Sequence, residues 1–264
     1  VVSRLLAEAV LPTWHVAAIG AHGQTVRHQP GQYDGTGYTL QLNNPALLAD
    51  HTGIDVVADF RTRDVVAGGQ GAPLVPAFHA RVFGQPDQTQ AVLNIGGIAN
   101  LTVIPPQNQA AAPVLGFDSG PGNALMDHWC LQHTGQPFDR DGQWAAQGQT
   151  HAGLLADLMQ EPFLQQAPPK STGRDLFNPA WLELHLKAHP HLSATQVQAT
   201  LTEFTALSCA QAVQTHAPDS ARLLVCGGGA LNGHLISRLQ HHLPEVNVES
   251  SALAGLPPLQ VEAV

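Results

Sequence analysis

Three glycine-rich turns in this sequence have the composition of phosphate-binding loops. They are residues 96–97 (GG), residues 118–123 (DSGPGN) and residues 227–229 (GGG), and each follows an apolar stretch typical of a strand. Glycine lets backbone amides approach a phosphate without an intervening Cβ, and a following helix N-terminus adds favourable partial charge. Any one of them is most simply a tight turn, but three in strand contexts favour a nucleotide site.

Known nucleotide motifs do not account for these turns. The sequence contains no GxxxxGK[ST], and no GxGxxG opens its first strand-helix unit, so neither a P-loop nor a Rossmann dinucleotide site is supported. The phosphate cradle is therefore expected to have another design.

Asp118 is the candidate catalytic residue. It ends an apolar strand directly before a glycine turn and a helix, which is where open α/β folds bind ligands. A carboxylate there can act as a general base or as a metal ligand through water. The structural alternative is an Asx turn or helix cap, but Asn123 is placed to provide the cap, so catalysis is favoured. A hydrolase elbow at Ser119 is disfavoured because GxSxG is not satisfied.

Two polar loops carry cations suited to an anionic ligand. Arg61 and Arg63 follow a buried strand beside Asp59 and Asp64, and a guanidinium binds carboxylate or phosphate in bidentate fashion. An Arg/Asp ion-pair network is about equally supported. The second loop, residues 170–175 (KSTGRD), is either a surface turn or a flap over an anionic ligand.

The histidines do not predict a metal site. The chain has 15 of them but no HExxH and no companion cysteine pair. His22, His28, His51 and His79 are each expected to be polar surface or satisfied loop residues.

Composition limits the classes of protein that remain. The 264 residues are 44% hydrophobic and 12% charged with a net charge of −9, which indicates a globular core rather than disorder. No basic stripe favours nucleic acid, no apolar run is long enough to span a membrane, and no signal peptide opens the chain. Three cysteines without metal spacing fit reduced cytosolic thiols.

Strands and helices alternate along the chain, which predicts an α/β fold. Strands are expected at residues 15–20, 38–42, 54–60, 114–118, 221–226 and 246–250, and residues 90–105 predict a hairpin with a glycine tip. Residues 21–31 are expected to form a polar loop, and most of residues 61–83 a long loop with a helical end. Helices are expected at the start of the chain and at residues 44–52, 124–135, 151–159, 179–188, 193–216 and 230–243, the helix at 193–216 with a capping box.

Six strings in order resemble the anhydro-N-acetylmuramic acid kinase family over essentially the whole chain. They are GAHGQTVRHQP, DFRTRDVVAGGQGAPLVPAFH, LNIGGIANLTV, GFDSGPGN, PPKSTGRDLFN and VCGGGALNGHL. The resemblance implies a two-lobed actin-like ATPase (ribonuclease H-like) fold closing over ATP, with residues 1–88 in the N-terminal lobe and residues 89–264 in the C-terminal lobe.

The resemblance also implies roles for particular residues. Asp118 matches the family's catalytic aspartate. The implied nucleotide-binding residues are Gly96, Gly97, Gly120, Gly227, Gly228, Gly229 and Asn232, and the implied sugar-binding residues are Arg61, Arg63, Gly71 and Glu262.

The implied reaction is an ATP- and Mg²⁺-dependent opening and phosphorylation of 1,6-anhydro-N-acetylmuramic acid in cytoplasmic peptidoglycan recycling. The partner is then a small amino sugar, with neither nucleic acid nor membrane, and a homodimer is the candidate assembly. The family's first phosphate loop does not precede Val1 and its closing helix does not follow residues 261–264, so we expect a piece truncated at both ends with an incomplete site. The alternative is a truncated or non-catalytic nucleotide-binding member of the same superfamily.

Overall fold

The computed structural model describes residues 1–109 and 112–261 and divides the chain into two compact units. The N-terminal unit is Val1–Ala72 and the C-terminal unit is Pro73–Val264. The boundary between residues 88 and 89 that the sequence suggests for the lobes of the whole protein stays a prediction. Helix α4 (Pro76–Phe83) lies in the C-terminal unit, where it packs on strand β6 (Ile98–Ile104).

The N-terminal unit contains two small sheets. Strands β1 and β4 pair in parallel, and strands β2 and β3 form an antiparallel hairpin. Helix α2 has the predicted ends, with the Asn44 side chain accepting from the Leu47 amide and Gly53 in the left-handed conformation. The elements are α1 (Val2–Glu8), β1 (Ile19–Ala21), β2 (Gln24–Pro30), β3 (Gly37–Leu42), α2 (Pro45–Thr52), β4 (Val56–Ala58) and α3 (Thr62–Val66).

The C-terminal unit is built on one five-stranded sheet in the order β7-β6-β5-β8-β9. Strand β6 is antiparallel to both of its neighbours, while β5, β8 and β9 run parallel, so β7 runs in the same direction as β5. Four strands therefore have their carboxyl ends at one edge. The other strands are β5 (Gln90–Ile95), β7 (Leu115–Pro121), β8 (Arg222–Cys226) and β9 (Asn247–Ser250).

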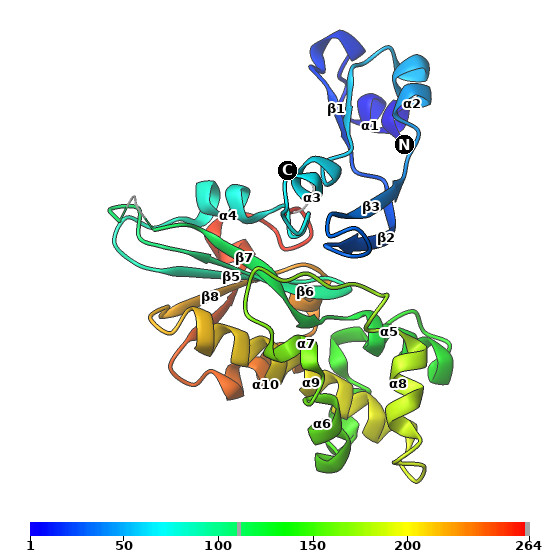
Figure 1. The fold of residues 1–264 in the computed structure, drawn as a ribbon, viewed down its shortest axis with the longest axis vertical. Helices are drawn as coiled ribbons and strands as arrows, with labels where there is room; N and C mark the ends of the chain where they lie inside the picture. Colours follow the sequence, from blue (N-terminus) through cyan, green and yellow to red (C-terminus); the bar gives the residue numbers. More distant parts are fainter. Residues whose placement is uncertain (110–111, 262–264) are drawn as a thin grey trace. The chain divides into compact units, whose positions relative to one another are not determined.

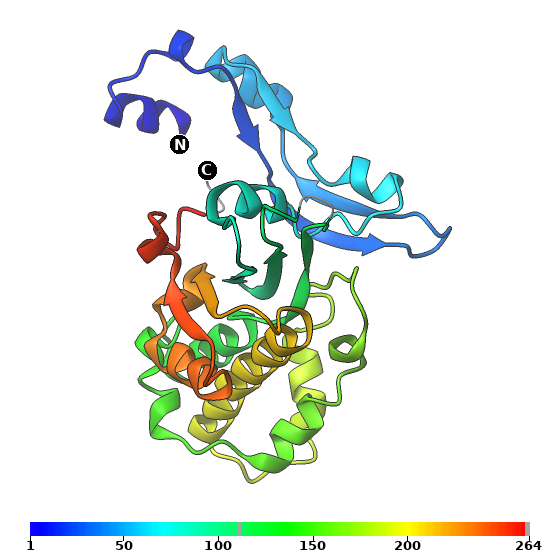
Figure 2. The same cartoon turned by 90° about the vertical axis from the view of Figure 1, so that its left-hand side faces the viewer.

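Both faces of this sheet are covered. Leu93, Leu101 and Phe117 are register partners that pack into the larger core, together with side chains of the helices. Val92 points to the opposite face and packs with Phe83 of α4, since successive strand residues alternate between faces. Figure 1 shows α9 and α10 on one face of the sheet and α4 on the other, and Figure 2 shows the same arrangement after a quarter turn.

The helical layer is organised by α9, a 23-residue helix with many buried side chains. Its N-terminus has the predicted capping box, in which Ser193 and Gln196 exchange hydrogen bonds with each other's backbone amides. The helices of this layer are α5 (Ala124–Thr134), α6 (Ala152–Leu158), α7 (Pro162–Gln165), α8 (Pro179–Leu186), α9 (Ala194–His216) and α10 (Gly233–His242).

The α/β class is confirmed, but several local expectations were wrong. The strand expected at residues 15–20 begins only at Ile19, after a 3-10 turn at Thr13–His15. Residues 24–30, expected as loop, form β2 because they pair with β3. Strand β7 continues through Pro121, so the glycine turn starts at Gly122. In the second and third cases pairing with another strand overrode local composition, whereas the first strand is short because only Ile19–Ala21 pair with β4.

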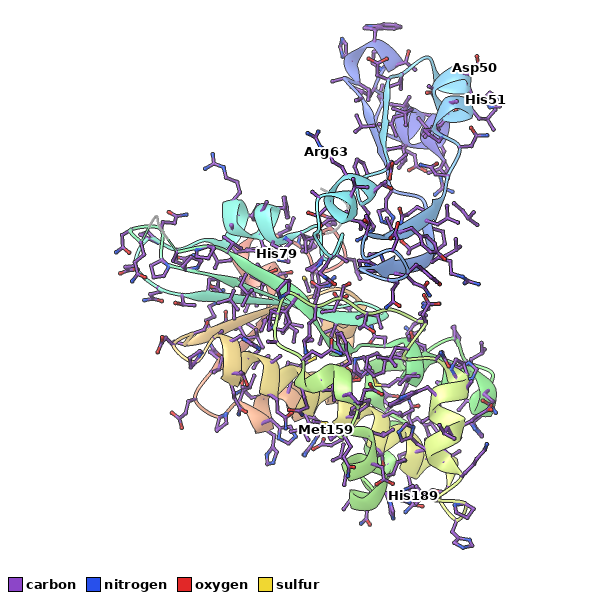
Figure 3. All side chains as sticks on the ribbon, viewed as in Figure 1. Asp50, His51, Arg63, His79, Met159 and His189 are labelled. Atoms are coloured by element: carbon purple, nitrogen blue, oxygen red, sulfur yellow. The ribbon has the colours of Figure 1, made fainter. Side chains whose placement is uncertain are left out.

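His79 also differs from its expected surface or loop position. It is fully buried on α4, where its Nδ1 lies 2.8 Å from Thr102 Oγ1 of β6 (Figure 3). Among the described residues, no helix is long and apolar enough to cross a membrane.

Candidate active site

The carboxyl ends of β5, β7 and β8 bring the three glycine-rich turns together. The tip of the β5-β6 hairpin, residues 96–97, contacts the turn between β7 and α5. The Gly122 amide donates to Gly97 O at 3.0 Å, and the Asn123 amide donates to Gly96 O at 2.7 Å. Segments that are separate in the sequence are thus held in one place by backbone hydrogen bonds.

Asn123 does not cap α5 with its side chain, contrary to the sequence prediction. No side-chain hydrogen bond caps this helix, and Asn123 Nδ2 instead donates to Ile95 O at 3.1 Å. The side chain is drawn away from the helix because the end of β5 offers an acceptor. Asn123 therefore ties the β7-α5 turn to the β5-β6 hairpin.

The triple-glycine turn, residues 227–229, packs closely against the end of β5. A Cβ at Gly227 would collide with Asn94 Oδ1, and one at Gly229 would collide with the Ile95 side chain. Gly227 also has a positive φ of 78°, which favours glycine. A Cβ at Gly228 would lie 3.4 Å from Asn123 Nδ2, so this turn also borders the β7-α5 turn.

Two of the expected nucleotide residues have structural contacts of their own. Gly120 is a buried residue of β7, and a Cβ there would lie 3.2 Å from Ser208 Oγ of α9. The Asn232 side chain caps α10 by accepting from the Leu235 amide at 3.0 Å. Their roles toward a nucleotide stay predictions.

Asp118 is 5% exposed and lies on β7 near the carboxyl edge of the sheet. Its Oδ2 accepts a hydrogen bond from the Thr172 amide at 2.9 Å, and its own amide donates to Lys170 O at 3.2 Å. Residues of the KSTGRD loop thus fix both the backbone and the carboxylate of Asp118.

Two asparagines accompany Asp118 across the sheet. Asn94 of β5 pairs with Asn100 of β6, and Asn100 pairs with Asp118 of β7, so all three side chains share the face that α4 covers. Asn100 Oδ1 is buried and accepts no hydrogen bond from any described residue. We did not single out these asparagines from the sequence, although the hairpin register around residues 96–97 places Asn94 opposite Asn100.

Lys170 is buried in the core rather than exposed on a surface turn. Its Nζ donates to Phe163 O at 3.0 Å and to Leu164 O at 3.1 Å, and it lies 4.6 Å from the centre of the Phe163 ring. Burial lowers the pKa of Lys170 from its ordinary 10.5, while the charge of Asp118 acts to raise it. This lysine anchors the segment that holds Asp118.

The expected sugar-binding residues form a second cluster within the N-terminal unit. Arg61 donates from Nε to His22 Nε2 at 2.8 Å and from Nη1 to Gly71 O at 2.6 Å, while the Gly71 amide donates to Asp64 Oδ2 at 2.7 Å. Arg61 and Gly71 are therefore brought together. Arg63 is exposed on α3 (Figure 3).

The remaining expected residue, Glu262, lies outside the described residues. Within residues 1–109 and 112–261, no group of three or more His, Cys, Asp or Glu side chains is arranged to hold a metal ion. A metal ion at Asp118 would therefore need oxygen donors other than a cluster of carboxylates.

Comparison with known proteins shows the family of this chain. A model of the anhydro-N-acetylmuramic acid kinase family matches residues 1–264. An anhydro-N-acetylmuramic acid kinase of Variovorax paradoxus is 63% identical over 264 residues, covering 100% of this chain and 70% of the relative. One of Albidiferax ferrireducens is 61% identical over 279 residues, covering 100% of this chain and 72% of the relative.

Solved structures match the chain at lower similarity. Component A of the Acidaminococcus fermentans (R)-2-hydroxyglutaryl-CoA dehydratase has a TM-score of 0.49 and 13% identity, covering 96% of this chain and 76% of that one. A putative N-acetylmannosamine kinase of Listeria monocytogenes has a TM-score of 0.37 and 14% identity, covering 98% and 80%.

The sheet order, with its antiparallel second strand and glycine turns gathered at the carboxyl edge, fits the fold expected for a sugar kinase of the actin-like ATPase class. Such kinases use a nucleotide and a small-molecule substrate. Within that class, the match over the whole length places the chain in the anhydro-N-acetylmuramic acid kinase family.

Proposed function

We propose that this chain carries out the nucleotide and acid-base chemistry of an ATP-dependent anhydro-N-acetylmuramic acid kinase. The observation that carries the proposal is the buried carboxylate of Asp118 beside three clustered glycine turns, in a chain of this family. The non-catalytic alternative is not favoured, because relatives at 63% and 61% identity are named as kinases.

In the proposed reaction, Asp118 accepts a proton from a water that attacks the anomeric carbon of the sugar. The bond from that carbon to the ring-bridging 6-oxygen breaks while the bond to the water oxygen forms. The released 6-oxygen takes the γ-phosphoryl group of ATP, giving N-acetylmuramic acid 6-phosphate and ADP. Because Thr172 donates to one oxygen of Asp118, the carboxylate is held in a fixed orientation for this proton transfer.

The proposed nucleotide residues are those of the clustered turns. Gly96, Gly97 and Gly228 border the β7-α5 turn, and Gly227 and Gly229 pack on the end of β5. We assign the phosphates to the hairpin and the nucleoside to the triple-glycine turn with Asn232, and we keep Gly120 as a residue that shapes the strand below. Arg61, Arg63, Gly71 and Glu262 are proposed for the sugar.

Mg²⁺ fits the oxygen donors beside the phosphate hairpin. Mg²⁺ binds one or two carboxylates together with substrate phosphates and keeps several waters, so a large protein cage is not required. The unsatisfied Asn100 Oδ1 would hold it directly, and the Asp118 carboxylate would hold it through a water. When bound, the ion offsets negative charge on the transferring phosphoryl group.

Cytoplasmic location and a homodimer complete the proposal. Both follow from the resemblance to the family, and fractionation of cells and light scattering of the purified protein test them.

The test of the function uses wild-type protein and Asp118→Asn with ATP, Mg²⁺ and the anhydro-sugar. Wild type is expected to release ADP and the 6-phosphate sugar, and Asp118→Asn to lose about 10²- to 10⁴-fold in kcat, because the base is removed. Binding of a non-hydrolysable ATP analogue, measured by calorimetry, should stay near wild type. Absence of both products with wild type, or equal turnover by the variant, would overturn the assignment.

A further inference from the structure

The KSTGRD loop, residues 170–175, is held firmly at both ends. Its first residues bond to Asp118, and Lys170 is anchored on the carbonyls of α7. At its other end, the Leu176 and Phe177 amides donate to Gly173 O at 3.1 and 3.2 Å, and the Phe177 side chain is buried in the core. The backbone of Arg174 is therefore fixed between two anchors.

Arg174 lies against the tip of the phosphate hairpin. A Cβ at Gly97 would be 3.5 Å from Arg174 Nη2 and 3.7 Å from its Nε, which is ordinary van der Waals contact. The guanidinium and the hairpin tip are neighbours although their residues are far apart in the sequence. One segment thus connects the proposed base, through Thr172, with the proposed phosphate site, through Arg174.

Hydrogen-bond donors remain available at the tip of the β5-β6 hairpin. The carbonyls of Gly96 and Gly97 are used by the β7-α5 turn, whereas the amides of these two glycines donate to no other described residue. The Arg174 side chain likewise makes no hydrogen bond, and no ion pair within 4.0 Å, with any residue the structure describes. Two amides and a guanidinium form a donor set that suits a phosphate group.

Asp127 of α5 is an acidic group that interacts electrostatically with Arg174. Burial raises the pKa of Asp127 to about 6, and the charge of Arg174 acts to lower it. Because the two groups interact only at longer range, Asp127 does not occupy the donors of the guanidinium. It does offer a structural alternative for Arg174, namely compensation of a buried carboxylate, which an experiment has to separate.

We propose that Arg174 binds the terminal phosphates of the nucleotide at the tip of the β5-β6 hairpin. The inference rests on the proposed function for the identity of the ligand. It adds a cation that the glycine turns lack, and it explains why the loop that holds Asp118 extends to the hairpin. Arg174 is then a phosphate-binding residue on the same segment that orients the base.

The test compares Arg174→Ala, Arg174→Lys and the control Arg81→Ala in the full chain. Arg81 is an exposed arginine of the same unit and lies on α4. His79 of this helix contacts Thr102 of β6, away from the hairpin tip. Calorimetry with a non-hydrolysable ATP analogue and with AMP measures binding. Arg174→Ala is expected to weaken the analogue about 10- to 100-fold and leave AMP unchanged, because charge-assisted bonds to the terminal phosphates are lost.

Arg174→Lys should recover part of the affinity, since it keeps the charge but not the bidentate geometry. Unchanged analogue binding by Arg174→Ala would overturn the proposal. Equal weakening of the analogue and AMP would also overturn it, as would recovery in the double variant Arg174→Ala/Asp127→Asn, because both indicate a structural role. Analogue binding that depends on Arg174, in a wild-type protein that does not phosphorylate the sugar, would reject the proposed function and leave this inference standing.

Discussion

Lys170 shows how a buried residue can position the proposed base, Asp118, through a backbone hydrogen bond and an anchored side chain. Lysines are seldom fully buried, yet this one is 5% exposed and gives its protons to two carbonyl oxygens. Its backbone oxygen accepts from the Asp118 amide at 3.2 Å. The buried ammonium therefore stabilises the position of the strand residue that carries the proposed base.

Replacing this lysine should affect both stability and turnover. Lys170→Met leaves the carbonyls of Phe163 and Leu164 without their donor, which should lower the free energy of unfolding by about 1–3 kcal/mol. The value of kcat should fall as well, since Asp118 is less firmly held. Urea unfolding and steady-state kinetics measure the two effects.

The control is Lys187→Met, at the chain's other lysine, which is exposed. It should leave both quantities near wild type. A Lys170→Met protein with unchanged unfolding free energy and unchanged kcat would show that the buried ammonium has no positioning role.

At the scale of elements, α4 is fastened to the sheet by a small number of specific contacts. His79 pairs with Thr102, and a Cβ at Gly116 would collide with Pro76, so the first turn of α4 lies directly on β7. Glycine is needed at position 116 because helix and strand approach so closely. The helix covers the same sheet face that carries the row from Asn94 to Asp118.

The docking of α4 should depend on pH through His79. Burial lowers the pKa of His79 from 6.5 to about 4. Between these values the unfolded chain binds a proton that the folded chain does not, so the unfolding free energy falls as pH falls from about 6.5 to 4. The loss should approach about 3 kcal/mol at the lower end.

His79→Gln keeps a polar group near Thr102 but does not titrate. Its unfolding free energy, measured by denaturant titration across this pH range, should therefore show a smaller slope than wild type. His241→Gln, at an exposed position of α10, serves as the comparison. Identical slopes for wild type and His79→Gln would refute the assignment.

At the scale of the whole molecule, the two units differ in how much apolar surface they bury. Among the described residues of Val1–Ala72, the buried hydrophobic side chains are Ile54 and Val65. The C-terminal unit instead has one large core that joins the sheet to the helical layer. Since apolar burial is the main favourable contribution to folding, the units should differ in local stability.

Hydrogen exchange should reveal this difference in the 264-residue chain. Amides of β1 and β4 should exchange faster than those of β5, whose residues are all buried. Mass spectrometry of peptides from each strand measures the rates, with the β5 peptide as internal reference. Equal protection of β1, β4 and β5 would contradict the prediction.

The sequence by itself determined the features that depend on local chemistry. The glycine turns, the cap of α2 by Asn44, the capping box of α9 and the α/β alternation each follow from residues close together along the chain. The ordered motifs also determined the family. Such features need no knowledge of which distant segments meet.

Only the tertiary structure decided how these features combine. Strand β8 pairs with β5 across a long stretch of chain, and this pairing sets the triple glycine beside the hairpin. The side chain of Asn123 bonds to Ile95 O rather than capping its helix because the fold presents that acceptor. Lys170 is buried because α7 supplies two carbonyls. Burial and strand register arise from contacts between distant residues, and no local pattern encodes them.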